Sequence, residues 1–218
     1  MTVKVSGVNS VAGIRQLHEI GVDYVGMAFN ERSQHYFVPQ LMNEIADLKG
    51  QEIAKVGMFV DADKDTILHA IEDFDLTSVQ LSGKETPEFC HDLMGRVNVI
   101  KCFRLRPGKS IDETLKPYHD ACNYFLFDTS FTDKTGTRFS FDWKALEDAL
   151  IDKLFFLSGA IGPDDAKKIG SVYHPFFYGV DINTRFETQP GRKDVELIKK
   201  FIKEIKFEAN DPVNAGTS

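Results

Sequence analysis

The chain has 218 residues, 42% of them hydrophobic and 27% charged, with a formal net charge of −7 at pH 7. This apolar content supports one substantial core and excludes a disordered chain, and the acidic balance disfavours nucleic acid, which requires a basic surface. The three cysteines are odd in number and scattered, which argues against a disulfide framework. We recognise no signal peptide and no apolar stretch long enough to cross a bilayer, so we expect a cytoplasmic protein without a membrane partner.

Eight runs rich in branched or aromatic residues, each closed by small or polar residues, predict β-strands. In chain order they are Val3–Ser6, Tyr24–Phe29, Ala54–Val60, Ser78–Leu81, Val99–Arg104, Tyr124–Asp128, Leu154–Ser158 and Phe176–Ile182.

Segments with helical spacing lie between these runs. Val11, Ile14, Leu17 and His18 line one face of the first, with Asn9 or Ser10 as the N-cap and Gly21 as the stop. Further helices are predicted at Thr66–Phe74, Phe141–Leu150, Pro163–Ile169 and Asp194–Ile205, and Arg106–Tyr118 has the weakest helical pattern. The alternation predicts an α/β fold, a (β/α)8 TIM barrel, with one domain over residues 1–207 and a flexible tail over 208–218.

The carboxyl ends of the strands form the working face of such a barrel. The polar residues expected there are Ser6, Asp61, Asp63, Ser82, Arg104, Asp128, Ser158, Asp181 and Asn183. The runs Leu157–Ile161 and Gly179–Thr184 end abruptly in small and polar residues, after the last two strands, where this fold most often holds a phosphate. Small residues let backbone N–H groups approach an anion, and a following helix adds its positive end, so we expect a phosphorylated small molecule as the partner.

Metal and nucleotide cofactors are not expected. Asp61, Asp63, Asp65 and Glu72 have the spacing of calcium ligands, but Thr66 stands where the calcium loop needs glycine. The histidines show no zinc motif, and no glycine-rich dinucleotide fingerprint follows a strand.

Several short motifs together resemble the phosphoribosylanthranilate isomerase family along nearly the whole chain. They are Lys4–Gly7, Val56–Val60, Val79–Gly83, Leu126–Thr129, Thr135–Gly136, Phe141–Trp143, Leu157–Gly159, Gly179–Asp181, Phe186–Glu187 and Pro190–Asp194. The resemblance implies a TIM barrel that catalyses, without a cofactor, the Amadori rearrangement of N-(5-phosphoribosyl)anthranilate to a 1-deoxyribulose 5-phosphate in tryptophan biosynthesis. An acid must open the sugar ring and a base must remove the C2′ proton. The resemblance assigns the acid to Asp128.

Several residues depart from the family pattern at the expected site. Ser6 stands where the family has its basic cysteine, and a hydroxyl ionises far less readily than a thiol, so Ser6 is either an activated base or a small turn residue. His35 stands where the family has an arginine that contacts the anthranilate carboxylate. His35 is either a weaker, pH-dependent contact for that carboxylate or a solvated loop residue, and Arg32 could take the place of the missing arginine. Ser82 replaces a histidine. Asp133 and Lys134 replace two glycines of the loop after the sixth strand.

The resemblance also implies a set of substrate-binding residues: Gly7, His35, Ser82, Gly159, Ala160, Asp181, Asn183 and Thr184. Arg185 would add a cation beside the phosphate.

The motifs leave three functions open. The first is the isomerase, with activity reduced by Ser6; the second is a non-catalytic or re-purposed paralogue that binds a sugar phosphate; the third is isomerisation of a different aminoaldose phosphate. The chain is expected to be a monomer or a homodimer.

Overall fold

The computed structural model describes residues 1–37, 53–106, 108–132, 138–140, 142–159 and 161–209, and in it eight parallel strands close into a barrel. The strand order around the barrel is β1-β10-β9-β6-β5-β4-β3-β2. The bounds are β1 Thr2–Ser6, β2 Tyr24–Ala28, β3 Ala54–Phe59, β4 Ser78–Leu81, β5 Asn98–Arg104, β6 Tyr124–Asp128, β9 Phe155–Ser158 and β10 Phe177–Ile182. The predicted TIM barrel is confirmed, and every predicted strand agrees to within one residue at each end.

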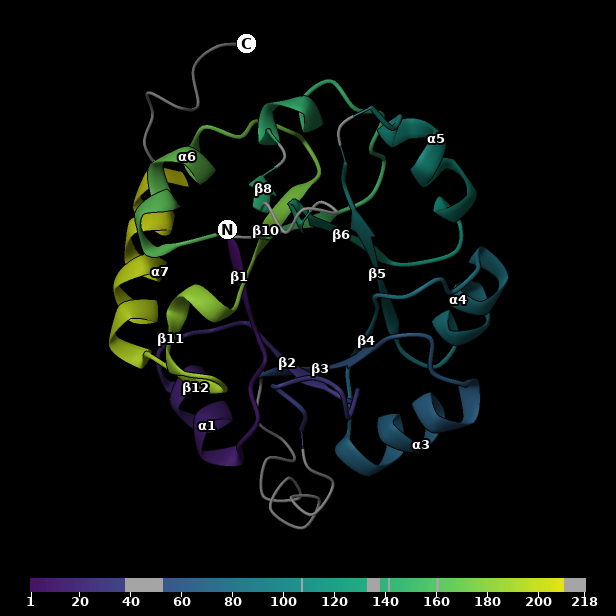
Figure 1. The fold of residues 1–218 in the computed structure, drawn as a ribbon, viewed down its shortest axis with the longest axis horizontal. Coiled ribbons are helices and arrows are strands. Elements are labelled where there is room, and N and C mark those ends of the chain that lie inside the picture. The colour runs from purple at the N-terminus through teal and green to yellow at the C-terminus, as the bar shows by residue number, and fades with distance from the viewer. Residues whose placement is uncertain (38–52, 107, 133–137, 141, 160, 210–218) are drawn as a thin grey trace.

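The described helices lie around the outside of the barrel, as the view down it shows (Figure 1). They are α1 Val11–Glu19, α3 Lys64–Phe74, α4 Pro87–Met94, α5 Ile111–Leu115, α6 Ala166–Gly170 and α7 Val195–Ala209, with 3-10 turns η3 Lys116–Tyr118, η4 Trp143–Leu146, η5 Pro163–Asp165 and η6 Thr184–Phe186. The first helix confirms its prediction in detail. Ser10 Oγ caps α1 by accepting from the Gly13 N–H at 3.1 Å, and Gly21 follows the helix with a φ of +82°.

The predicted helix Phe141–Leu150 is wrong in kind. Only the 3-10 turn η4 forms there, because Trp143 and Leu146, three residues apart, are the buried pair, and that spacing stacks side chains on one edge of a 3-10 turn. The weak pattern over Arg106–Tyr118 yields only α5 and η3.

One helix and two hairpins were not predicted. Helix α4 begins at Pro87 after the N-cap Thr86. Two small antiparallel hairpins, β7 Ser130–Thr132 with β8 Arg138–Ser140 and β11 Glu187–Gln189 with β12 Arg192–Lys193, lie beyond the barrel strands. Helix α7 ends at Ala209, and the expected tail lies outside the described residues apart from its first two positions.

Aromatic side chains fill one layer of the barrel interior. Tyr24, Tyr124, Phe156 and Tyr178 pack edge to face or tilted, with ring centroids 5.3–6.5 Å apart, beside Val56, Ile100 and Leu126. A second, larger apolar core lies between the strands and the surrounding helices. Lys4 and Ser6, further along β1, are fully buried polar residues, so the polar part of the interior is the end toward which the strands run.

No described helix is long and apolar enough to cross a membrane.

Candidate active site

A cavity of about 260 Å³ opens at the carboxyl ends of the strands. Its walls come from β1 to β6, β9 and β10 and from the segments that follow them: Ser6, Ala28, Asn30, Ser33, Met58, Phe59, Val60, Gln80, Ser82, Cys102, Arg104, Leu126, Asp128, Ser158, Asp181 and Asn183. A second cavity of about 180 Å³ adjoins it and shares Asp128, Ser158, Asp181 and Asn183. Gly159, Ile161, Thr184 and Arg185 complete the second cavity. The fold therefore gathers the predicted polar residues of six strand ends around two joined hollows.

Ser6 is held between a lysine and an aspartate. Lys4 Nζ donates to Ser6 Oγ at 2.5 Å, and Ser6 Oγ donates to Asp181 Oδ1 at 2.6 Å. Lys4 Nζ also pairs with Asp181 Oδ1 at 3.1 Å, and the two side chains are 0% and 5% exposed. Register explains the contact, because Lys4 lies opposite Asp181 in the β1–β10 pair and Ser6 is two residues along the same face.

Gly26 of β2 makes room for this cluster. Gly26 lies opposite Ser6 in the β1–β2 pair. A Cβ there would lie 2.9 Å from Ser6 Oγ and 3.2 Å from Lys4 Nζ. Because Gly26 has no side chain, the Lys4 ammonium and the Ser6 hydroxyl occupy the space next to it.

Asp128 ends β6 at the junction of the two cavities. It lies opposite Arg104 of β5 and Ser158 of β9 in the barrel register, and it is half-buried. Since Asp128 and Ser6 line the same cavity, the structure brings the predicted acid and the predicted base position to one site.

The turn after β9 is held by Thr129, the residue that follows β6. Gly159 has a φ of +91°, in the left-handed region that favours glycine. Thr129 Oγ1 donates to the carbonyl oxygens of Ser158 and Gly159, at 2.7 and 3.2 Å, and accepts from Trp143 Nε1 at 3.0 Å. The turn is therefore anchored to a buried indole. Ala160, the other small residue predicted to hold the phosphate, lies outside the described residues.

The helix beyond this turn contributes less to an anion site than expected. The Gly162 N–H, at the start of η5, is taken by Asp165 Oδ2 at 2.6 Å, and Asp165 lies 3.8 Å from Arg185 Nη1. The groups of the second cavity that could contact an anion include Gly159, Asn183, Thr184 and Arg185.

His35 is not placed to bind a carboxylate of the substrate, because its side chain pairs with Glu187 instead. It is 6% exposed, its Nε2 lies 3.0 Å from Glu187 Oε1, and it does not line either of the joined cavities. Lys193 Nζ reaches the same carboxylate at 2.6 Å and Asn183 Oδ1 at 2.7 Å. Arg32, the possible substitute, is exposed and lines neither cavity.

Charge governs this buried cluster. Burial by itself would raise the pKa of Glu187, but the hydrogen bonds and charges of Lys193 and His35 outweigh it and hold that pKa below its ordinary value. Burial also lowers the pKa of Lys193, against the opposing effect of Glu187. Gly7 closes the cluster on the β1 side: its φ is +74°, and a Cβ there would lie 3.0 Å from His35 Cγ and 2.6 Å from Asn183 Oδ1.

Ser82 lines the larger cavity beside a residue that sequence reasoning missed. Its hydroxyl accepts from Gln80 Nε2 at 3.0 Å. Gln80 is 4% exposed, and among the described buried side-chain atoms its Oε1 is the one without a hydrogen-bond partner. Such an acceptor in a cavity wall suits a ligand that donates a hydrogen bond.

Cys102 does not supply the missing thiolate. Burial, with a further contribution from the Asp128 carboxylate, raises the pKa of Cys102 to about 12, so it is a neutral thiol at physiological pH.

Other acidic residues at this end have structural roles. Asp63 Oδ1 caps α3 by accepting from Thr66, and Asp61 Oδ1 accepts from the Lys84 N–H. The described residues contain no group of three or more His, Cys, Asp or Glu that could hold a metal.

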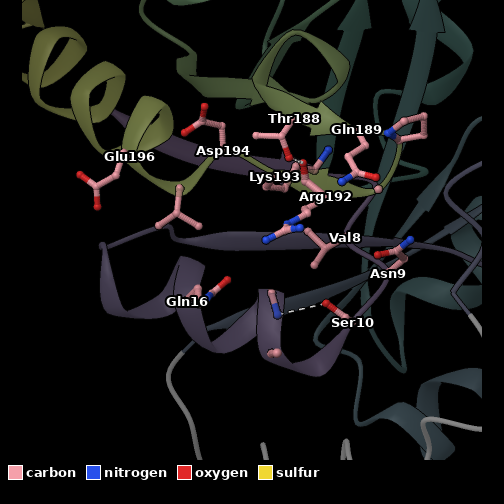
Figure 2. A pocket seen from close by; sticks show the side chains of 15 residues that line it. Val8, Asn9, Ser10, Gln16, Thr188, Gln189, Arg192, Lys193, Asp194 and Glu196 are labelled. Atoms are coloured by element: carbon pink, nitrogen blue, oxygen red, sulfur yellow. Dashed lines mark hydrogen bonds between the residues drawn. The ribbon is translucent and has the colours of Figure 1, made fainter.

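A larger hollow, about 850 Å³, lies outside the mouth of the barrel, between the start of α1 and the β11–β12 hairpin (Figure 2). Asn9, Ser10, Gln189 and Arg192 are among its lining residues, and it contains neither Ser6 nor Asp128. The smaller cavities are therefore the better candidates for chemistry, despite their size.

An eight-stranded parallel barrel with a polar double cavity at the carboxyl ends of its strands defines a TIM-barrel protein with a small-molecule site in the usual place of that fold. The family model described as N-(5′-phosphoribosyl)anthranilate (PRA) isomerase matches residues 3–204. The chain is 34% identical to the N-(5′-phosphoribosyl)anthranilate isomerase of Parabacteroides distasonis, over 94% of this chain and 93% of that protein.

Solved structures agree with the sequence relatives. The phosphoribosyl anthranilate isomerase of Thermotoga maritima superposes with a TM-score of 0.81 at 29% identity, covering 95% of this chain and 99% of that one. A phosphoribosyl anthranilate isomerase in complex with reduced 1-(o-carboxyphenylamino)-1-deoxyribulose 5-phosphate gives 0.79 at 28%, with the same coverage. The chain belongs to the N-(5′-phosphoribosyl)anthranilate isomerase family.

Proposed function

We propose that this protein is an isomerase that converts N-(5′-phosphoribosyl)anthranilate to its 1-deoxyribulose 5-phosphate product in tryptophan biosynthesis. The observation that carries the proposal is that Asp128 and Ser6 share one cavity, which runs into a second hollow lined by Gly159 and Thr184. The two hollows fit the two ends of such a substrate: an aromatic ring at one end and a phosphate at the other.

Asp128 is the proposed acid. It lies where the cavities join, so a sugar ring held between them would present its ring oxygen to this carboxyl group. Ser6 holds the base position. A hydroxyl is a poorer base than a thiolate, so we expect turnover below that of relatives with cysteine there.

Phosphate binding is assigned to the turns after β9 and β10. Gly159, Asn183 and Thr184 supply small or polar groups to this end, and Arg185 supplies positive charge. Ser82 contributes to the wall of the larger cavity, whereas Gly7 lines neither cavity and packs against His35 and Asn183. We place the enzyme in the cytoplasm, without a nucleic-acid partner, as a monomer or a homodimer; a dimeric relative is known from Thermotoga maritima.

The test is rescue of a tryptophan auxotroph that lacks the isomerase, together with an assay of the purified protein. We expect rescue, and a loss of about 10²–10⁴-fold in kcat for Asp128→Asn, the usual contribution of a general acid. Failure of both rescue and turnover, with phosphate still bound, would favour a sugar-phosphate-binding paralogue.

One observation favours a second candidate, an isomerase for another aminoaldose phosphate. His35, at the position of the carboxylate-binding arginine, is committed to Glu187. Turnover of a substrate analogue without the ring carboxylate, faster than turnover of the anthranilate compound, would support that candidate.

A further inference from the structure

The hydrogen-bonded set Lys4–Ser6–Asp181 contains a route for the proton that Ser6 must lose. The hydroxyl group of Ser6 has one proton, and the neighbouring side chains determine where that proton points. The Lys4 ammonium can only donate to Ser6 Oγ, so the Ser6 hydroxyl donates its own proton to Asp181 Oδ1 at 2.6 Å. Asp181 Oδ2 is itself held by Ser158 Oγ at 3.3 Å. The carboxylate is therefore positioned as an acceptor for the serine proton.

We propose that Asp181 and Lys4 act through Ser6 as a proton relay that replaces the family's thiolate, an inference that rests on the proposed isomerase function. In the open-chain iminium form of the substrate, Ser6 Oγ takes the C2′ proton while its own proton passes to Asp181 Oδ1. The C2′–H electron pair becomes the C1′=C2′ double bond, and the C1′=N π pair moves to nitrogen. The C1′=C2′ π pair then takes the proton that returns from Asp181 through Ser6, while the C2′ O–H bond breaks and its electron pair forms the C2′=O carbonyl. That hydroxyl proton goes to Asp128, which gave up its own proton when the sugar ring opened, so every group ends as it began and the reaction is a net isomerisation without any other reactant.

Lys4 stabilises the charge that this step moves. Its ammonium lies within hydrogen-bond distance of both Ser6 Oγ and Asp181 Oδ1, so negative charge that builds on either oxygen meets a desolvated cation. The cluster is open to substrate only at Ser6 and Asp181, which line the cavity, while Lys4 is wholly buried behind them. Lys4 and Asp181 are thus positioning residues.

The test is a double-mutant cycle. Asp181→Asn is made in the natural chain and in a Ser6→Cys variant, whose thiol can ionise before substrate binds and needs no acceptor. We expect Asp181→Asn to lower kcat by about 10²-fold or more beside Ser6, and by less than about 10-fold beside the cysteine. A merely structural role for Asp181 would cost the same factor in both backgrounds, because both lose the contact with Lys4, and that result would overturn the relay.

Lys4→Met provides the second arm. Because the ammonium would stabilise an alkoxide or a thiolate, we expect kcat to fall about 10-fold or more in both backgrounds, with KM nearly unchanged. The matched control is Lys55→Met, a buried lysine of β3 that pairs with Asp75 at 2.8 Å away from the cavity, and kcat should stay within about 2-fold. Equal losses for Lys4→Met and Lys55→Met would assign Lys4 to stability alone.

An inactive natural chain counts against the proposed function itself, whereas an active chain with an inactive Ser6→Cys variant counts against the relay.

A different observation carries a second inference, about the ring carboxylate of the substrate. Arg104 is the only cationic side chain among the described residues that line the 260 Å³ cavity, and its guanidinium makes no hydrogen bond or ion pair with those residues. We infer that Arg104 binds the anthranilate carboxylate in place of the arginine that His35 replaces. Guanidinium groups bind carboxylates with two parallel hydrogen bonds, and the ring end of the cavity offers no other positive charge within the described set.

Arg104→Met tests this assignment. We expect KM for the anthranilate substrate to rise about 10–100-fold, and KM for the analogue without the carboxylate to change by less than about 2-fold. Arg106→Met, an exposed arginine just beyond β5 that lines neither cavity, is the control. Equal effects of Arg104→Met on both substrates would overturn the inference, and a chain inactive on both would count against the proposed function.

Discussion

Gln80 leaves one buried oxygen without a partner in the wall of the candidate site. An unpaired buried acceptor costs about 1–3 kcal/mol of stability, whereas a hydrogen bond to a ligand recovers about 0.5–1.5 kcal/mol net. The residue is therefore better explained by ligand binding than by folding.

Gln80→Met should separate these two effects. We expect KM to rise roughly 3–10-fold because the ligand loses its acceptor, while the melting temperature stays the same or increases. Steady-state kinetics and thermal denaturation measure the two quantities. Gln189→Met, an exposed glutamine at the outer hollow, should change neither. A lower melting temperature with unchanged KM would assign Gln80 to the core.

At the scale of elements, the β11–β12 hairpin is tied to the β2 side of the barrel by charge. His35, Glu187 and Lys193 form one buried cluster whose side chains are 8%, 7% and 3% exposed. Because the pKa of Glu187 is lowered in the folded protein, its ionised form contributes stability above its ordinary pKa of 4.5, and that contribution is lost as pH falls through the lowered folded value.

Glu187→Gln should remove this acid dependence. At pH 7 we expect a loss of up to about 3–5 kcal/mol in the free energy of unfolding, because a buried lysine is left without its carboxylate. The difference from the natural chain should shrink as pH falls below about 4.5. Urea denaturation at several pH values measures it. Glu72→Gln, at an exposed residue of α3, should give nearly parallel curves. A stability difference between Glu187→Gln and the natural chain that does not depend on pH would contradict the assignment.

The elements also show what the sequence could and could not predict. The eight barrel strands are runs of four to seven residues rich in branched or aromatic side chains, so all eight could be predicted, whereas β11 and β12, with three and two residues, have no period to detect. At the site, Ser6, Ser82, Asp128 and Asp181 were placed by the rule that polar residues ending barrel strands share one face.

Contacts between distant segments were beyond that rule. His35 and Glu187 are 152 residues apart, and only the closed fold shows that they meet. Lys4 is different: it lies two residues before Ser6 on a strand, so the period of two already predicts that both side chains point to the same face. That signal was present in the sequence and was overlooked.

At the scale of the whole molecule, the phosphate end of the site should be visible in global stability. A ligand that binds only the folded state at 100 times its Kd adds about 2.7 kcal/mol, and each kcal/mol raises the melting temperature of a domain this size by roughly 2–4 °C. Inorganic phosphate should therefore raise the melting temperature by several degrees. Sulfate, which has a similar tetrahedral shape, should raise the melting temperature by a smaller amount.

Gly159→Val tests where this anion binds. The substitution places a branched side chain at a φ of +91°, so the protein should lose stability and also the phosphate-dependent increase. Gly21→Val places the same side chain at a φ of +82° far from the cavities, so it should lose stability but keep the increase. Equal phosphate responses in the two variants would move the anion site elsewhere.

The anchored indole at the mouth of the barrel makes the protein its own optical probe. Trp143 is the single tryptophan of the chain, its Nε1 donates to the threonine that holds the Gly159 turn, and Lys168 Nζ lies 4.0 Å above its ring. Occupation of the turn should shift or quench its fluorescence, with a midpoint equal to the phosphate Kd from thermal denaturation, and Thr129→Val should weaken that response. Stopped-flow emission could then time substrate arrival and product departure in single turnovers, without a dye or a coupled assay.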